Sequence, residues 1–572
     1  MIKIFIFLTI FISISFASSL KEVYFKNNKT LKSEYLYKNL GIYIEKAWYE
    51  FYKNSTPKAN DILIKSLKIS IINLYKNQGF YHTFIDTIED DKSITFVIDE
   101  NTPLSIKDIK IDSDYEISKI IDFKKGDRFI SQKFVDIKKK IKNIMKQEGF
   151  CNYDLISKAY VDLKLNTVNL TYDLSKNKIC KFGDIKVVKP DDIVDKVILS
   201  RLYYKKDSPY SSKYLVKSYE SLLGLDAFDS ANIKEENYGS QINTTVIVTP
   251  KKNRIRRKIG VGYETLYGPR AIFGWEERNF YGGARKLAFE LKYSKDEQYF
   301  KNTFFFPAFL KLSAFKTYLD LKNEFIFSRI AYKKFEEEKY VDIIHLQKDY
   351  ETFSIDLGLD YENIKIKTDG GVCGVENGTF ILLSPFIKAI YDNRDSKIDP
   401  KKGLYLSAFL ETGLTYLASS SSYSKLLLEG RLIKTIGEFT IAGKSKLGMI
   451  NVFEKTLPES KLFFAGGGFS NRAYAYNRLS ATDGSCDSLG GKTMIDNSLE
   501  ISHPISENFS LGVFWDATML SRESNYFDLD FKHSYGGGIR YITPIGPIKF
   551  DVGFDSKDSS IYALHLQVGQ SY

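Results

Sequence analysis

Histidine is scarce in this chain, with five among 572 residues: His82, His345, His503, His533 and His565. No two of them lie at the spacing of zinc ligands, which excludes the common zinc sites. The triple glycine at 466–468 lacks the strand-to-helix context of a phosphate-binding loop. We therefore predict no metal, no cofactor and no enzymatic activity.

Long apolar stretches are lacking beyond the start of the chain. After residue 20 no window is apolar for the roughly 18 residues that a membrane-spanning helix requires. The start itself is different, because Lys3 precedes an apolar run over residues 4–16, and the small residues of 17–19 follow. This order is typical of a secretory signal peptide. We predict that residues 1–19 are removed and that the mature protein is exported.

The C-terminal half shows alternation of apolar and polar residues. In the last segment, 560–572, one face carries Tyr562, Leu564, Leu566, Val568 and Tyr572. The same period of two recurs in 495–502, 509–516 and 548–555. Such alternation over a membrane thickness, with short turns and long loops, is typical of outer-membrane strands. An apolar edge would promote aggregation, so the strands should close. We predict sixteen antiparallel strands in residues 253–572, with uncertain boundaries between 306 and 350.

Residues 20–252 contain an internal repeat. One helical stripe is followed by Gly79-Phe80, and a second stripe, shifted by a constant number of residues, is followed by Gly149-Phe150. The two stripes are Ile64, Leu67, Ile71, Leu74 and Phe134, Ile137, Ile141, Ile144. A third copy places Leu215, Tyr219 and Leu222 ahead of Gly224. Repeats of this length indicate a tandem array of small modules, here of α+β type.

Three α+β modules before a sixteen-stranded barrel resemble the BamA/TamA outer-membrane assembly superfamily, whose modules are called POTRA domains. Phe463 to Gly467, followed by Asn471-Arg472-Ala473-Tyr474, resembles the family's Arg-Gly-(Tyr/Phe) loop motif, with alanine in place of glycine. The resemblance implies POTRA domains at 20–103, 104–181 and 182–252 and a barrel at 253–572. Three modules and this length resemble TamA more than BamA.

The loop motif also has a physical interpretation. The segment 454–492 is too long for a simple hairpin connection, and loops of this length are usually functional. If Trp515 faces lipid, alternation turns Glu500 and Asp516 toward the lumen. Arg472 is then expected to turn inward, because a planar guanidinium can serve two carboxylates. The alternative is an exposed loop arginine. The predicted lumenal loop lock consists of Arg472, Tyr474, Glu500, Phe514 and Asp516.

Glycines occur in both the first and the last predicted strand. Gly260, Gly262 and Gly569 weaken strand pairing and are candidates for a gate between these strands. The alternative is that they only fill space on the lumen side. The end of the chain resembles the closing-strand signal of the family, formed here by Leu566, Val568, Gly569 and Tyr572.

The four cysteines form two topological sets. Cys151 and Cys180 flank the strand pair of the second module, whereas Cys373 and Cys486 lie in predicted extracellular loops. Both locations are oxidising enough for disulfides. Each pair is a candidate disulfide, and free thiols remain the alternative.

The resemblance implies a TamA-type factor that inserts β-barrel proteins, such as autotransporters, through a lateral gate between the first and last strands. The alternative is a two-partner secretion transporter, which exports one cognate polypeptide through its pore. Expected partners are unfolded outer-membrane proteins and outer-membrane lipid. An inner-membrane-anchored TamB-like partner bound through residues 20–103 is left open. The net charge of +11 is spread along the chain, so nucleic acid is not expected. The expected location is the bacterial outer membrane, with periplasmic modules.

Overall fold

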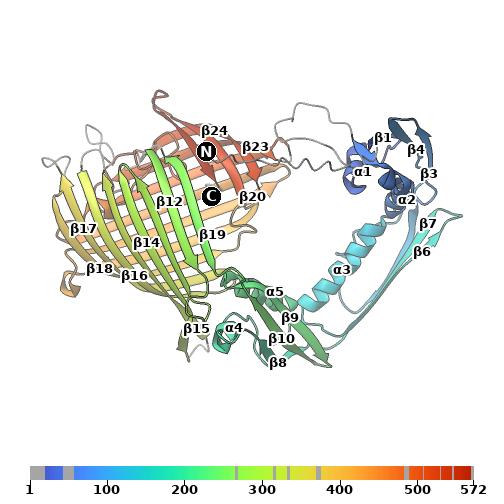
Figure 1. The fold of residues 1–572 in the computed structure, drawn as a ribbon, viewed down its shortest axis with the longest axis horizontal. Helices are drawn as coiled ribbons and strands as arrows, with labels where there is room; N and C mark the ends of the chain where they lie inside the picture. The colour runs from blue at the N-terminus through green and yellow to red at the C-terminus, as the bar shows by residue number, and fades with distance from the viewer. Residues whose placement is uncertain are drawn as a thin grey trace, which may run out of the picture. The chain divides into compact units, whose positions relative to one another are not determined.

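The computed structural model describes residues 20–42, 57–264, 268–313, 317–331, 335–368, 375–481, 489–506, 508–527, 530–543 and 546–568. The chain divides into two compact units (Figure 1). One unit contains residues up to 185 together with 204–216 and 235–244. The other contains residues 186–203, 217–234 and 245–572.

The first module is a four-stranded sheet of order β2-β1-β4-β3 with two helices. β1 runs parallel to β4, and β3 runs antiparallel to it. Helix α2 begins where the Asn60 side chain accepts a hydrogen bond from the N–H of Leu63, which is a regular N-cap. The elements are β1 (Leu20–Lys26), α1 (Ser33–Asn39), β2 (Lys58–Asn60), α2 (Asp61–Asn77), β3 (Phe84–Glu89) and β4 (Ser93–Asp99).

The second module has a three-stranded sheet of order β5-β7-β6, in which β5 and β7 are parallel. Its long helix packs on the sheet with Ile137, Ile141 and Met145 fully buried. The equivalent residues of α2 are Leu67, Ile71 and Tyr75, so the predicted repeat is present in the packing. The elements are β5 (Ser105–Ser113), α3 (Ser131–Gln147), β6 (Tyr153–Asp162) and β7 (Thr167–Lys176).

The repeated glycines lie where each helix meets the chain that follows it. Gly79 and Gly149 have φ of +91° and +95°, a conformation that favours glycine. A Cβ at Gly79 would lie 2.2 Å from the carbonyl oxygen of Phe129, and one at Gly149 would lie 2.8 Å from that of Tyr210. Both positions therefore require glycine for two reasons, conformation and close approach of a backbone.

The third sheet has the order β8-β10-β9. Its helix α5 buries Leu215 and Leu222, as predicted, but Tyr219 is exposed, so this part of the prediction was wrong. Ser218 is buried instead, and its hydroxyl accepts a hydrogen bond of 2.8 Å from the N–H of Tyr203. The elements are β8 (Lys181–Val188), α4 (Asp195–Leu199), α5 (Ser212–Gly224), β9 (Phe228–Tyr238) and β10 (Gln241–Pro250).

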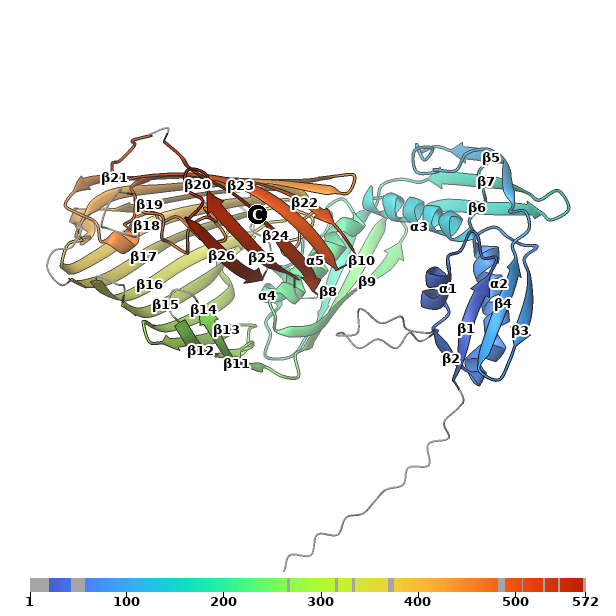
Figure 2. The same cartoon turned by 90° about the horizontal axis from the view of Figure 1, so that it is seen from above.

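The C-terminal region is one 16-stranded sheet in which consecutive strands are antiparallel neighbours, from β11 to β26 (Figure 2). The predicted fold class is thus confirmed. The strands are β11 (Ile255–Glu264), β12 (Gly268–Glu277), β13 (Lys286–Ser294), β14 (Glu297–Leu312), β15 (Thr317–Ala331), β16 (Phe335–Asp349), β17 (Phe353–Thr368), β18 (Gly378–Asp392), β19 (Lys402–Gly413), β20 (Ser422–Ile436), β21 (Phe439–Glu454), β22 (Thr493–Pro504), β23 (Phe509–Ser521), β24 (Lys532–Thr543), β25 (Gly546–Asp555) and β26 (Tyr562–Val568).

The two faces of the barrel wall differ in chemistry. Leu499, Val513 and Trp515 are exposed on the outer face, whereas Glu500 and Asp516, one residue along, are at most 2% exposed on the inner face. This alternation is what an apolar surround and an enclosed polar lumen require. Among the described residues, no helix is long and apolar enough to cross a membrane.

Candidate functional site

Arg472 lies inside the barrel on the long loop between β21 and β22, and only 1% of it is exposed. Its Nε and Nη2 donate to the two carboxylate oxygens of Asp516 over 2.9 and 2.8 Å. Its Nη1 donates to Glu500 over 2.7 Å. The structure therefore brings together the guanidinium and both carboxylates, in the bidentate geometry that arginine favours.

Phe514 completes the immediate surroundings of this guanidinium. Its ring centroid lies 3.4 Å from Cζ of Arg472, so the cation stacks on the aromatic face. Tyr474 lies two residues further along the same loop. Its hydroxyl donates to Asp555 on β25 over 2.7 Å, which fixes a neighbouring part of the loop to another strand.

Three charged residues that the sequence interpretation missed extend the cluster across β24 and β25. Arg540 pairs with Glu500 and with Asp551, each over 2.8 Å. Lys549 pairs with Glu500 over 3.2 Å. All three are at most 1% exposed. Their signal was present, because each occupies a polar position within an alternating strand. Three cations and three carboxylates thus lie together in the lumen.

The same loop has a second anchor at Lys461, which is 5% exposed. Its ammonium pairs with Glu362, with Glu411 over 2.6 Å and with Asp360 over 3.6 Å. These carboxylates belong to β17 and β19, far along the wall from β22 to β25. Lys425 on β20 adds a hydrogen bond of 2.8 Å to the carbonyl of Lys461. The loop is therefore held at two places on different strands.

The seam is the boundary between β11 and β26, the two edge strands of the sheet. Within the residues that the structure describes, no ladder joins β11 to β26. Ile259 and Val261 on β11 are 84% and 88% exposed. A Cβ at Gly262 would meet nothing within 4 Å, and one at Gly260 would meet only Ile272 at 3.9 Å. Packing therefore does not require glycine at either position.

Several predicted residues of the closing strand lie outside the described residues. These are Gly569 and Tyr572, and of Val568 only the backbone is described. Leu566, the remaining member of the predicted signal, is 74% exposed on the outer face. The structure thus places one residue of this set.

Cys151 and Cys180 form a disulfide bond. Asn152, beside Cys151, donates a hydrogen bond to the carbonyl of Gly239 in the turn between β9 and β10. The N–H of Cys180 donates to the carbonyl of Gly149 over 2.9 Å. The bond therefore lies where the second module meets the following chain. Cys373 and Cys486 lie outside the described residues.

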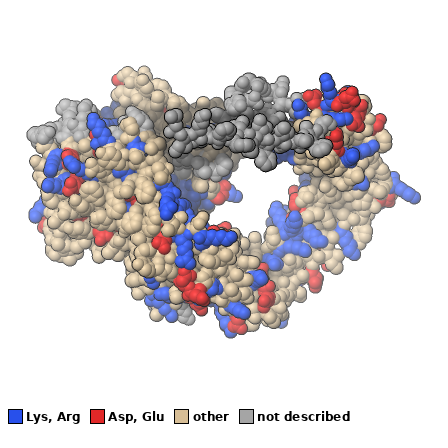
Figure 3. All heavy atoms as spheres, viewed as in Figure 1, with Lys and Arg blue, Asp and Glu red and all other residues tan. Residues whose placement is uncertain are grey.

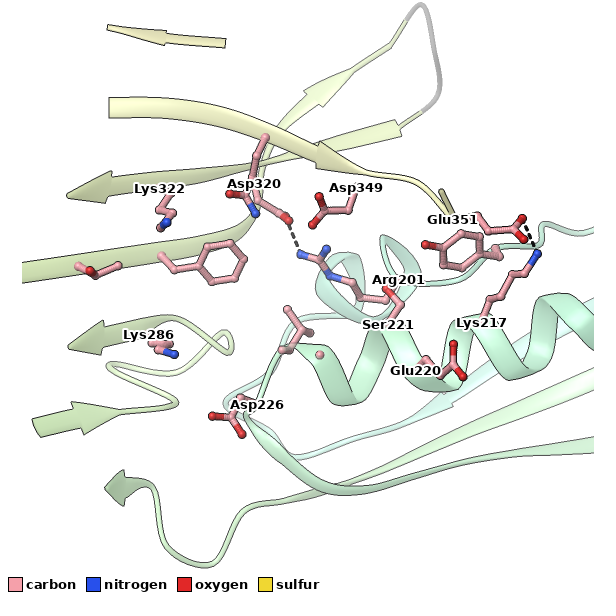
Figure 4. Close-up of a pocket in the computed structure, with 16 residues that line it drawn as sticks. Arg201, Lys217, Glu220, Ser221, Asp226, Lys286, Asp320, Lys322, Asp349 and Glu351 are labelled. Carbon is pink, nitrogen blue, oxygen red and sulfur yellow. Dashed lines mark hydrogen bonds and ion pairs between the residues drawn. The ribbon is translucent and has the colours of Figure 1, made fainter. Parts of the chain in front are cut away.

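A cavity of about 600 Å³ lies at the end of the barrel where β13 to β16 approach α5 (Figure 4). Arg201 reaches Asp320 on β15 over 2.6 Å, and Lys217 on α5 pairs with Glu351. Charges of both signs line the cavity, which differs from the largely apolar pockets that hold small molecules.

On the face shown in Figure 3, Lys and Arg gather in several groups, and Asp and Glu lie among or beside them. In the described part of the chain, no group of three or more His, Cys, Asp or Glu side chains is placed to hold a metal ion.

Comparisons with known proteins agree with this geometry. The Omp85 superfamily domain matches residues 279–572, and a POTRA family described as a surface antigen variable number repeat matches residues 105–177. The structure of BamA from Haemophilus ducreyi lacking POTRA domains 1–3 is similar in fold, with a TM-score of 0.56 and 17% identity over 81% of this chain and 98% of that chain. CdiB from Acinetobacter baumannii gives a TM-score of 0.47 and 13% identity over 88% and 96%.

Proposed function

The chain belongs to the Omp85 superfamily, and from this premise we propose that it inserts β-barrel proteins, such as autotransporters, through a lateral gate between β11 and β26. The protein is an outer-membrane barrel with its POTRA modules in the periplasm. Its general task is the insertion or translocation of polypeptides at that membrane. The proposal specifies the route and the kind of polypeptide.

The observation that carries the proposal is the seam. In lipid every backbone N–H and C=O must find a partner, so an unpaired strand edge is unfavourable. Between β11 and β26 the described residues form no ladder, although fourteen strands between them are paired on both sides. An edge of this kind can accept a strand from another chain by β-augmentation. No covalent step is needed.

The fixed loop inside the barrel also favours a lateral route. The loop that carries Lys461 and Arg472 is fixed to two parts of the wall by buried ion pairs. Breaking a buried ion pair leaves an uncompensated charge, which makes displacement of the loop unfavourable. A two-partner secretion transporter would need a path through this lumen, whereas a lateral insertase would not.

Three sheets precede the barrel, and this number supports the TamA type. Under this proposal the partners are unfolded outer-membrane proteins, outer-membrane lipid and a TamB-like protein anchored in the inner membrane. The first module, residues 20–103, would receive the last of these. A pull-down with variants altered in this module, compared with the parent chain, tests that part separately.

Site-specific photo-crosslinking distinguishes the two routes. A photoreactive residue at Val261 lies on the outer face of the edge strand β11, and one at Tyr299 on β14 lines a lumenal hollow beside Lys301. The insertase predicts that barrel proteins crosslink to position 261 and depend on this protein for their abundance in the outer membrane. Crosslinks of one exported polypeptide at position 299 alone would instead identify a secretion transporter.

A further inference from the structure

The loop contacts the last strand through its backbone. The guanidinium of Arg472 binds Asp516 and Glu500, but its carbonyl oxygen faces β26, where Nε2 of His565 donates a hydrogen bond over 3.0 Å. A Cβ at Gly553 on β25 would lie 2.3 Å from the same oxygen. The loop can approach the last two strands this closely only because residue 553 is glycine.

A second contact lies four residues earlier in the loop. A Cβ at Gly468 would lie 1.0 Å from Nε2 of Gln567, the next inward-facing residue of β26. The side-chain oxygen of Gln567 is buried and has no hydrogen-bond partner among the described residues. A buried oxygen without a partner is unfavourable. This contact therefore positions the strand without binding it strongly.

We infer that His565 and Gln567 are positioning residues that form a latch between the loop and β26, and that the seam opens by release of this latch. The inference rests on the proposed function. When β26 moves, the loop stays on β22 to β25, because Arg472 holds it there. The latch determines where the edge strand rests while no substrate is bound.

Arg472 contacts the wall through its guanidinium and β26 through its carbonyl, and the strengths of these contacts indicate which of them breaks first. The guanidinium makes charge-assisted hydrogen bonds of 2.7 to 2.9 Å to two carboxylates. The carbonyl makes one hydrogen bond to a histidine, of 3.0 Å. Charge-assisted bonds are about twice as strong as neutral ones. The strand therefore separates from the loop before the loop separates from the wall.

Spin labels on the two edge strands measure this directly. Val261 and Leu566 are 88% and 74% exposed, so labels fit there without repacking. In the full-length protein, the His565→Ala/Gln567→Ala variant is expected to shift the label distance to longer values and broaden its distribution. The matched control is His345→Ala, a half-buried histidine of β16. An unchanged distribution in the latch variant, or an equal change in the control, would overturn the inference.

Three further variants keep the test informative if the double variant folds poorly. His565→Gln retains a side-chain N–H donor and is expected to keep the parent distances. Gly468→Ala places a methyl group where the amide of Gln567 lies and is expected to lengthen the distance. Adding Gln567→Ala to Gly468→Ala should reverse that change, and failure of this reversal contradicts the latch.

Assembly activity separates the latch from the proposed function. The abundance of barrel proteins in the outer membrane is measured in cells that depend on each variant. A changed label distance with unchanged assembly would support the latch and contradict lateral insertion. An unchanged distance overturns the latch and leaves lateral insertion to its own crosslinking test.

Discussion

The interior around Arg472 and the seam between β11 and β26 differ in how their polar groups are paired. Around Arg472, cations and carboxylates from the loop and four strands are paired in a fully buried cluster. At the seam, the described parts of two strands carry backbone groups without a ladder partner. Ion pairs thus hold the loop, whereas the proposed gate lies where the described backbone groups have no ladder partner.

Under the proposed lateral gate, this difference separates the part of the barrel that stays fixed from the part that opens. Within the described residues β26 is paired with β25 alone, so its displacement breaks one ladder, whereas displacement of an inner strand breaks two. The loop joins the two regions, since Arg472 contacts both.

Removing the guanidinium of Arg472 should lower the stability of the barrel more than the other substitutions. Arg472→Ala leaves Asp516 and Glu500 without their main partner, which costs on the order of 3–5 kcal/mol when a buried pair is broken. We expect the folded band on gels to be lost at a lower temperature and the loop 454–492 to be cut faster by protease. Lys455→Ala, an exposed residue of the same loop, is the control. Equal protease sensitivity of both variants would contradict the anchor.

The disulfide tests a rigid junction outside the barrel. Cys151→Ser/Cys180→Ser opens a bond between residues 29 apart in sequence, and the expected loss in free energy of unfolding is about 2–4 kcal/mol. Calorimetry of the full chain should show a lower transition for the modules and an unchanged one for the barrel. Reduction of the parent protein is the control. Non-reduced peptide mapping of the same sample also tests the predicted Cys373–Cys486 pair.

The second anchor should matter less than the first. Lys461→Met removes the cation between Glu362 and Glu411, but Lys339 still pairs with Glu362 over 2.5 Å. The expected cost is therefore about 2–3 kcal/mol, that of a buried charged group that keeps part of its pairing. Gel heat-stability measures it. A loss larger than that of Arg472→Ala would reverse the ranking of the two anchors.

Two glycines offer a matched pair with the smallest effects. In Gly149→Ala the added Cβ would lie against the carbonyl of Tyr210, and the alanine would have to adopt a positive φ. The substitution should therefore destabilise the modules by about 1–3 kcal/mol. In Gly224→Ala, at the end of α5, the added Cβ would have no atom within 4 Å, so the stability of the modules should change little. Thermal unfolding of both variants makes the comparison. Equal shifts would mean that the junction does not need glycine at position 149.

The sequence predicted the features that depend on periodicity. The period of two predicted β22, β23, β25 and β26, and the shifted helical stripes predicted the packing of α2 and α3. Arg472, Glu500 and Asp516 were grouped because alternation and charge complementarity are local rules. Arg540 and Lys549 were missed although they occupy polar positions of alternating strands and pair with Glu500. Lys461 was missed because it lies outside the strands, where no alternation indicates the direction of a side chain. Tyr219 was misplaced because the buried face of α5 consists of Leu215, Ser218 and Leu222, so that a polar residue takes the place that hydrophobicity assigned to the tyrosine.

Closing the seam covalently tests lateral insertion most directly. Cysteine pairs drawn from residues 259–262 of β11 and 564–567 of β26 are screened for those that oxidise in the folded barrel. The account predicts that the oxidised protein stays folded but loses assembly activity, and that reduction restores it, because an added strand needs both edges apart. Full activity of the oxidised, crosslinked protein would contradict lateral insertion and favour passage through the lumen.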